Sequence, residues 1–166
     1  MKHLNVQEAQ FLKLLEHNKR LIFKIANVYC RKAEDRQDLI QEIILQLWRS
    51  YPTFDTTYAQ TTWIYRIAIN VSISFLRKEN TRRKNHAIYR QELELLTCDE
   101  GELIGQKLDL LYQLIENLNS FEKAIIILYL EGLKNKEISD VIGISESNVS
   151  TKINRIKNKL RSYSNT

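Results

Sequence analysis

The scarcity of residues that interrupt helices constrains this chain more than any other feature of its sequence. Only four glycines and one proline occur in 166 residues, so the backbone is forced to turn in few places. Leu, Ile, Lys, Glu, Gln and Asn dominate the composition, and several of these residues form helices readily. We therefore expect an all-α protein built from long helices.

In the first half of the chain, apolar residues recur at three- and four-residue spacings, which is typical of amphipathic helices. The pattern predicts a helix or close helix pair over Val6–Cys30, a second helix from near Glu34 to the stop at Pro52, and a third over Thr61–Lys78. Proline disfavours helical geometry in the residue before it. A loop is therefore expected over Ser50–Gln60.

The second half has a compact pattern of four helices. They are expected over Leu108–Leu118, Ser120–Leu130, Leu133–Ile142 and Glu146–Tyr163, with Ser120 and Ser145 placed to cap the second and fourth. Residues 85–106 are acidic and lack a sustained apolar face. We expect two small helical domains, residues 1–84 and 107–166, joined by a flexible linker over 85–106.

The segment Leu133–Val149 has the pattern of a helix-turn-helix. Ile138, Val141 and Ile142 form one apolar face, Gly143 can adopt the positive φ of a sharp turn, and Ile144 can fill the corner. In the helix that follows, four apolar residues step by four, three and four positions and must face the core. They are Val149, Ile153, Ile156 and Leu160.

The outward face of that last helix carries short polar groups and cations, which suit the major groove of DNA. Five basic residues and no acid lie between Asn148 and Arg161. A solvated helix at the end of a bundle is the alternative. The candidate DNA contacts are Ser147, Asn148, Ser150, Thr151, Lys152, Asn154 and Arg155.

The charge balance favours an anionic partner, because the chain has 25 basic and 20 acidic residues and therefore a net charge of +5. A second basic cluster spans Arg77–Lys84. The most hydrophobic stretch, Ala124–Leu130, is much too short to cross a bilayer. A cytoplasmic protein without membrane insertion is expected.

Residue types that support catalysis or metal binding are few and scattered. Cys30 and Cys98 lie far apart and form no CxxC pair, and His3, His17 and His86 fall in different segments. We therefore expect no metal, no cofactor and no enzymatic activity.

Two further segments, Glu34–Trp48 and Thr62–Asn70, resemble region 2 of the extracytoplasmic-function (ECF) group of sigma factors in the sigma-70 family. Residues 108–161 resemble region 4 of the same family, and the order and spacing agree. The resemblance implies a transcription initiation factor that binds core RNA polymerase and promoter DNA. It also implies an anti-sigma factor as regulator. The alternative from the residues alone is a dimeric helix-turn-helix regulator that binds an operator.

The resemblance assigns one face of the second helix to the clamp helices of the polymerase's largest subunit. Trp48 can serve as a large anchor and the carboxylates can seek basic partners. The alternative is a solvated acidic stripe with Trp48 in the core. The residues assigned to polymerase are Asp38, Leu39, Gln41, Glu42 and Trp48.

The resemblance also assigns the loop Thr53–Thr62 and the helix after it to an unpaired base of the −10 promoter element, while region 4 is assigned to the −35 element. Trp63 and Tyr65 can instead be core aromatics, and for Trp63 the core is the preferred placement. The loop lacks the glycine and basic residues often found there. The residues assigned to the −10 element are Tyr58, Tyr65, Arg66 and Asn70.

Overall fold

The computed structural model describes residues 6–57, 59–85 and 102–164, with side chains over residues 6–57, 59–81 and 109–163. Within these ranges the chain forms seven α-helices, one short 3-10 helix and no strand. The expectation of an all-α protein is confirmed. Tyr58, His3, His86 and Cys98 lie outside the residues whose side chains are described.

The N-terminal half packs three long helices together. They are α1 (Val6–Tyr29), α2 (Ala33–Ser50) and α3 (Gln60–Asn85), and the 3-10 helix η1 (Tyr51–Thr53) follows α2. α2 buries Leu39, Ile43 and Leu47 completely, because a four-residue spacing returns each side chain to the same face. This face packs on α1 and α3.

The C-terminal half contains α4 (Glu102–Glu116), α5 (Ser120–Leu130), α6 (Asn135–Ile142) and α7 (Glu146–Ser164). α5 is the most apolar of these helices, and every residue from Lys123 to Leu128 is buried. α6 and α7 both pack against it. Because α7 packs against α5 and α6 with one side, its other side is exposed.

Two expected boundaries were wrong. α3 continues past Lys78 to Asn85, since no glycine or proline stands in the way, and it therefore carries the basic cluster Arg77–Lys84. α4 begins at Glu102, inside the segment expected to be a linker.

The cap of α5 was also misplaced by one residue. Asn119, and not Ser120, is the N-cap: its side chain accepts from the amides of Phe121 (3.1 Å) and Glu122 (2.9 Å). Glu122 completes a capping box by accepting from the Asn119 amide at 3.1 Å. The other expected cap is confirmed, because the amide of Asn148 donates to Ser145 Oγ at 3.3 Å.

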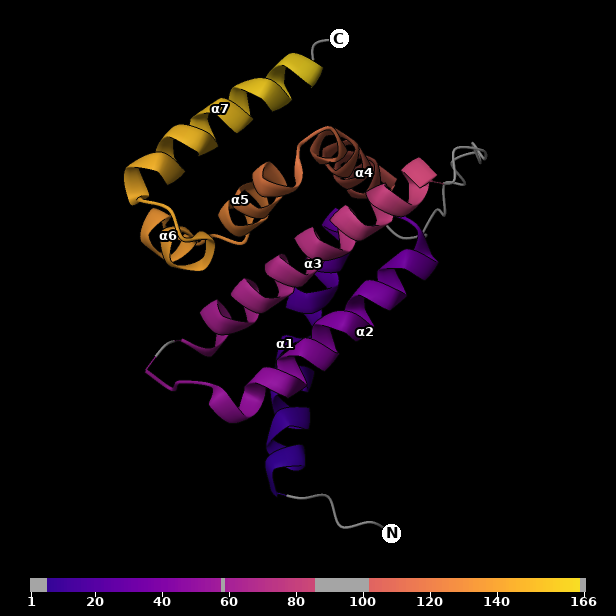
Figure 1. Cartoon of the computed structure of the whole chain (residues 1–166). Coiled ribbons are helices and arrows are strands. Elements are labelled where there is room, and N and C mark those ends of the chain that lie inside the picture. Colours follow the sequence, from indigo (N-terminus) through magenta and orange to yellow (C-terminus); the bar gives the residue numbers. More distant parts are fainter. Residues whose placement is uncertain (1–5, 58, 86–101, 165–166) are drawn as a thin grey trace.

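The two halves pack against each other. α5 contacts α1 and α3, α4 contacts α1, and α6 contacts α3, so that α5 and α6 lie between α3 and the outermost helix α7 (Figure 1). One continuous hydrophobic cluster joins residues of both halves. The hydroxyl of Tyr29 at the end of α1 donates to the Ser120 carbonyl at 2.8 Å. Its burial raises the pKa of Tyr29.

Candidate nucleic-acid interface

A sharp turn joins α6 to α7. Gly143 has φ +80° at the C-terminus of α6, and its amide donates to the Ser139 carbonyl at 2.8 Å. The Ser139 hydroxyl donates to the Ile144 carbonyl, which closes the turn. Ile138 is fully buried and Val141 is 6% exposed. The helix-turn-helix expected from the sequence is present.

The buried face of α7 follows the expected spacing. Val149, Ile153 and Ile156 are buried, and Leu160 packs partly buried against the same core. Short polar side chains are therefore turned outward. The exposed residues on this part of α7 are Ser147, Asn148, Ser150, Thr151, Asn154 and Arg155.

The lysines of α7 differ from this expectation, because three of them bind side chains of α5. Lys152 is half-buried with Nζ 5.2 Å from the centre of the Phe121 ring. Lys157 Nζ lies 4.1 Å from the Tyr129 ring centre and donates to its hydroxyl at 2.7 Å. Part of the positive charge of α7 is therefore used in contacts with α5 inside the protein.

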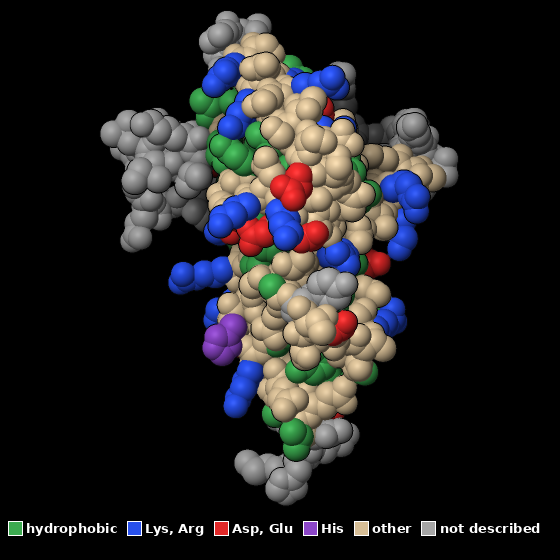
Figure 2. Space-filling view, turned by 90° about the vertical axis from the view of Figure 1, so that its left-hand side faces the viewer, with side chains coloured by type: hydrophobic (Ala, Val, Ile, Leu, Met, Phe, Trp, Pro, Cys, Tyr) green, Lys and Arg blue, Asp and Glu red, His purple; other side chains and the backbone are tan. Residues whose placement is uncertain are grey.

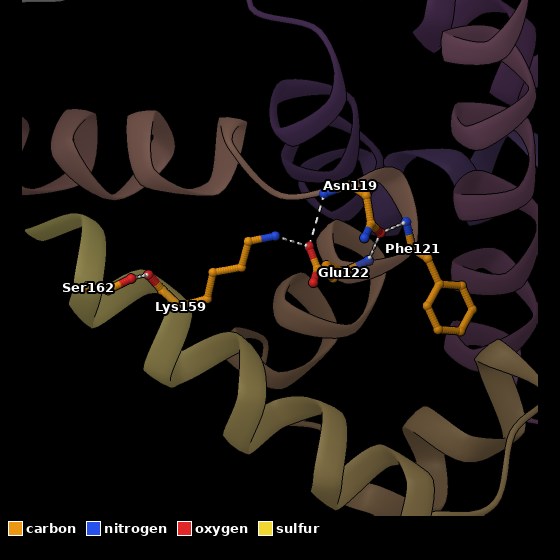
Figure 3. Close-up of polar contacts among 5 residues, drawn as sticks. All are labelled: Asn119, Phe121, Glu122, Lys159 and Ser162. Carbon is orange, nitrogen blue, oxygen red and sulfur yellow. Dashed lines mark hydrogen bonds and ion pairs between the residues drawn. The ribbon is translucent and has the colours of Figure 1, made fainter.

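Lys159 is the lysine of α7 that forms an ion pair with α5. Its Nζ lies 2.9 Å from Glu122 Oε2 (Figure 3). Partial burial raises the pKa of Glu122, but the hydrogen bonds from Lys159 and from the Asn119 amide outweigh it, and the pKa is lowered. The same hydrogen bond raises the pKa of Lys159. Lys159 therefore fastens α7 to the start of α5.

A pocket of about 180 Å³ opens where the loop after η1 meets α3. The rings of Phe54 and Trp63 form an aromatic wall, with centroids 4.7 Å apart and an interplanar angle of 43°. The Thr57 amide donates to Asp55 Oδ1 at 2.9 Å, which lowers the pKa of Asp55 and fixes the loop. The lining residues are Thr53, Phe54, Asp55, Thr62, Trp63 and Arg66.

Of the residues expected at the −10 site, the structure brings only some to this pocket. Arg66 lines it, and Asn70 is exposed one helical turn further along α3. Tyr65 points elsewhere: it is 6% exposed, and burial, with Glu131 nearby, raises its pKa to about 12. In this structure Tyr65 therefore lies in the core, which was the alternative placement, and its assignment to the −10 element stays a prediction.

Trp63 is both a core residue and a pocket residue. It is half-buried and packs against the hydrophobic cluster, while the ring also lines the pocket. Phe54 was not singled out from the sequence, and Trp63 was expected in the core and not at the pocket. The available signal was an aromatic residue on each side of a polar loop, but periodicity alone could not separate a half-buried ring from a buried one.

A second hollow, of about 410 Å³, lies along the outer face of α2. Asp38, Gln41 and Glu42 are exposed there, and Lys78 Nζ lies 3.4 Å from Glu42 Oε1. Leu45, Gln46, Arg49 and Val71 complete the lining and were not expected from the sequence.

Two other residues assigned to this face lie elsewhere. Leu39 is fully buried, so its role is to hold α2 on the core, and its assignment to a contact surface is wrong. Trp48 does not line the hollow and is 37% exposed, with its ring edge-on to Phe11 at a centroid distance of 5.0 Å.

Among the described residues, no three His, Cys, Asp or Glu side chains gather in a way that could hold a metal ion. No helix in that part of the chain combines the length and hydropathy that crossing a bilayer requires.

Comparison with known proteins identifies both halves. Residues 14–82 match the family model of sigma-70 region 2, and residues 108–160 match that of sigma-70 region 4. The chain is 26% identical over 162 residues to RNA polymerase sigma factor SigV of Bacillus subtilis, covering 97% of this chain and 95% of the relative. It is 28% identical to the ECF RNA polymerase sigma-E factor of Haemophilus influenzae, covering 83% and 82%.

A solved structure has the same fold. The sigma factor RpoE of Bartonella quintana, in complex with the anti-sigma factor NepR, superposes with a TM-score of 0.77 at 17% identity, over 92% of this chain and 95% of that one. The all-α fold and the helix-turn-helix of this chain agree with what these relatives indicate. The chain belongs to the sigma-70 family and is an ECF RNA polymerase sigma factor.

Proposed function

We propose that this sigma factor directs core RNA polymerase to a subset of promoters by contacting two promoter elements, one with each half. The pocket at the start of α3 captures an unpaired base of the −10 element, and the outer face of α7 reads the −35 element. Residues 1–84 and 107–166 are the two functional units, with 85–106 as the connection. The supporting observation is an aromatic-walled pocket on the same chain as an exposed polar recognition helix.

The chemistry of the pocket fits a flipped base. Taking a base out of the stack costs a few kcal/mol, so the protein must replace the lost stacking. Phe54 and Trp63 offer ring faces, Arg66 at the rim offers a guanidinium for phosphate, and the Asn70 amide offers a donor and an acceptor. Tyr58 belongs to the same loop and stays a prediction.

The chemistry of α7 fits base-edge readout in the major groove. Asn148, Ser150 and Asn154 expose hydrogen-bonding groups, and Arg155 exposes a guanidinium that can contact phosphate or guanine. Lys134 and Lys136, exposed at the start of α6, add charge beside the helix-turn-helix. Lys152, held over Phe121, contributes less than expected.

We infer that the hollow on α2 docks on core polymerase. Asp38 and Glu42 supply negative charge, and Leu45, 46% exposed, supplies an apolar contact in the lining. Trp48 is 37% exposed outside the hollow, and its contact with polymerase stays a prediction. Charged groups around an apolar centre are the usual composition of a specific interface.

We also infer regulation by an anti-sigma factor. The solved relative RpoE is in complex with the anti-sigma factor NepR, and CnrH, a second structural neighbour, is in complex with the cytosolic domain of CnrY. Extended to this chain, the inference predicts a protein partner that lowers transcription when added to the purified system.

Transcription in vitro with core polymerase on a library of genomic fragments tests the proposal. We expect a small set of products whose start sites share −10 and −35 sequences. Phe54→Ala is expected to lower initiation about tenfold, because stacking on one base is worth about 1–3 kcal/mol.

Phe23→Ala is the matched control, since Phe23 is a half-exposed phenylalanine on α1 outside the pocket. Equal initiation by the two variants would overturn the role of the pocket. Absence of any specific initiation by the unaltered chain would overturn the proposed function.

A further inference from the structure

A continuous row of aromatic rings runs from the end of α2 to the pocket at the start of α3. Phe11 of α1 packs edge-on against Trp48, at a centroid distance of 5.0 Å, and against Tyr51, at 5.3 Å. Tyr51 lies 6.5 Å from Trp63, and Trp63 lies 4.7 Å from Phe54. These distances are those of favourable aromatic pairs. The two rings that line the pocket are therefore the last members of a row that begins outside it.

Tyr51 is the member that joins the pocket rings to the rest of the row. It does not line the pocket itself, but its ring contacts that of Trp63. Its carbonyl accepts from the amide of Phe54 at 3.1 Å, which ties the second pocket residue to the same position. Tyr51 thus contacts Trp63 through its ring and Phe54 through its backbone.

The position of Tyr51 is in turn fixed from two sides. Its ring packs on Phe11, which is 5% exposed and belongs to the hydrophobic core. Its backbone begins η1, where Pro52 follows with a restricted φ. Side chains packed against a close-packed core are held in single rotamers. Tyr51 can therefore transmit the rigidity of the core to the rings of the pocket.

The pocket rings need such support because they are not enclosed themselves. Figure 2 views the molecule from the side on which the loop after η1 projects in Figure 1, and hydrophobic side chains reach this surface only in small patches. Phe54 and Trp63 are each half-buried. A ring that is open to solvent on part of its surface has fewer neighbours to fix its orientation.

We propose that Tyr51, held by Phe11, is a positioning residue for base capture: it sets the orientation of Trp63 and Phe54 so that the pocket is formed before the base enters. Tyr51 acts through these two rings and does not touch the base. Rings that are already oriented spare the cost of ordering them on binding. This inference rests on the proposed function, because it takes the pocket as the site of an unpaired base of the −10 element.

Substitutions of Tyr51 separate the ring contact from the hydroxyl. Tyr51→Leu removes the ring from the middle of the row, and Tyr51→Met removes it but leaves a longer and more adaptable side chain. Tyr51→Phe keeps the ring. Tyr112→Leu is the matched control, because Tyr112 of α4 is also a half-buried tyrosine packed against the hydrophobic cluster. All variants are compared at a temperature below their melting transitions.

Promoters that lack one base distinguish positioning from a general defect. A promoter found by transcription of the fragment library is prepared with an abasic site at each position of the −10 element in turn, on either strand. The position at which the abasic site most lowers initiation by the unaltered chain marks the captured base. Tyr51→Leu and Tyr51→Met are expected to lower initiation about tenfold on the intact promoter, where stacking is lost, and only slightly where that base is missing. Tyr51→Phe is expected to initiate like the unaltered chain on both.

The outcomes test the two claims separately. If no abasic site lowered initiation by the unaltered chain, base capture itself would be wrong, and the proposed role of the pocket would be lost. If one base did matter, but removal of the Tyr51 ring lowered initiation by the same factor with and without that base, the positioning role would be overturned. A defect of folding or of polymerase binding acts equally on both promoters. A base-dependent loss in Tyr112→Leu would overturn it as well.

The orientation of Trp63 can also be followed directly. Trp48 and Trp63 are the only tryptophans of the chain, so Trp63 is the single emitter in a Trp48→Phe background. Time-resolved fluorescence anisotropy reports its motion on the nanosecond scale. We expect Tyr51→Leu and Tyr51→Met to increase this motion, and Tyr51→Phe and Tyr112→Leu to leave it unchanged. Unchanged motion of Trp63 after removal of the Tyr51 ring would overturn the positioning role.

Discussion

Gly143 shows how one residue sets the angle between α6 and α7. Its φ of +80° lies in the left-handed region, and a Cβ added there would meet nothing within 4 Å. Substitution therefore carries a conformational cost without a clash. Gly143→Ala is expected to lower the free energy of unfolding by about 1 kcal/mol, measured by urea denaturation.

Gly143→Asn provides the comparison, since asparagine tolerates this conformation better than alanine. The loss of stability for asparagine is expected to be the smaller of the two. Alanine as stable as glycine would contradict the argument.

Glu122 stabilises two helices at once, because it closes the capping box of α5 and binds Lys159 of α7. Glu122→Ala is expected to cost about 1 kcal/mol in the free energy of unfolding. Glu122→Gln should cost less, since an amide oxygen can still accept from the Asn119 amide.

The lowered pKa of Glu122 gives this contribution a pH dependence. It is fully present above the usual carboxyl pKa of 4.5 and is lost as the pH falls through the lower folded-state pKa. The stability difference between the unaltered chain and Glu122→Gln is therefore expected to shrink below about pH 4.5. A difference that grows on acidification would contradict this assignment.

Turn and cap residues were predicted to within one position, since only the cap of α5 was misplaced, whereas exposure was predicted poorly. Gly143 and Ser145 were identified from turn and cap preferences alone. Leu39 and Tyr65 were assigned to surfaces and proved buried, because each belongs to a helix whose other residues do face solvent. The sequence shows the spacing of apolar residues along a helix. It does not show which neighbouring element covers the residues at the edge of the helix's apolar face.

At the scale of elements, we propose that α7 divides its cations between DNA and contacts within its own domain. Arg155 is exposed, whereas Lys157 binds Tyr129. Arg155→Ala is expected to weaken binding to the −35 sequence that the products of the transcription experiment share. It is also expected to reduce the slope of log affinity against log salt concentration by about one. The measurement is fluorescence anisotropy at several salt concentrations.

Lys157→Ala is the control on the same helix. It is expected to leave that slope nearly unchanged and to lower the melting temperature instead, because the contact with the Tyr129 ring is lost. A larger change of slope for Lys157→Ala than for Arg155→Ala would reverse the proposed division.

The hollow on α2 predicts a separate effect on polymerase. Asp38→Ala is expected to weaken binding to core polymerase about tenfold with an unchanged melting temperature, since the side chain is exposed and lines the hollow. Glu34→Ala removes an exposed carboxylate from the same helix outside the hollow. Equal affinities for these two variants would exclude Asp38 from the interface.

Helices were easier to predict than their ends. Each expected helix exists, because burial of one face imposes the spacing that periodicity detects. α3 was cut short at Lys78, where its apolar residues end, although its backbone has no reason to stop there. α4 was started late because Glu102–Gln106 gives no strong apolar period.

At the scale of the molecule, the sequence predicted two domains but not their contact. The groups that join the halves, such as Lys24 and Glu131, are more than a hundred residues apart in the chain, and no local pattern marks two distant charges as partners. Lys123 illustrates the point: it reads as a surface lysine but is 8% exposed, and burial lowers its pKa while Glu116 opposes that shift. Only the folded chain shows that the two cores are continuous.

Tyr29 tests whether this continuity makes the halves fold as one unit. Its ring is 4% exposed in the N-terminal core, and its hydroxyl donates to the Ser120 carbonyl at 2.8 Å. Tyr29→Phe keeps the ring and removes only the hydrogen bond, at a cost of about 1 kcal/mol. Because the bond ends on the first residue of α5, amide hydrogen exchange is expected to rise both in the last turn of α1 and in the first turn of α5.

Tyr163→Phe, at an exposed tyrosine near the end of α7, is the control and is expected to change the exchange in neither turn. Faster exchange confined to α1 would mean that the halves open independently and that their contact contributes little to stability.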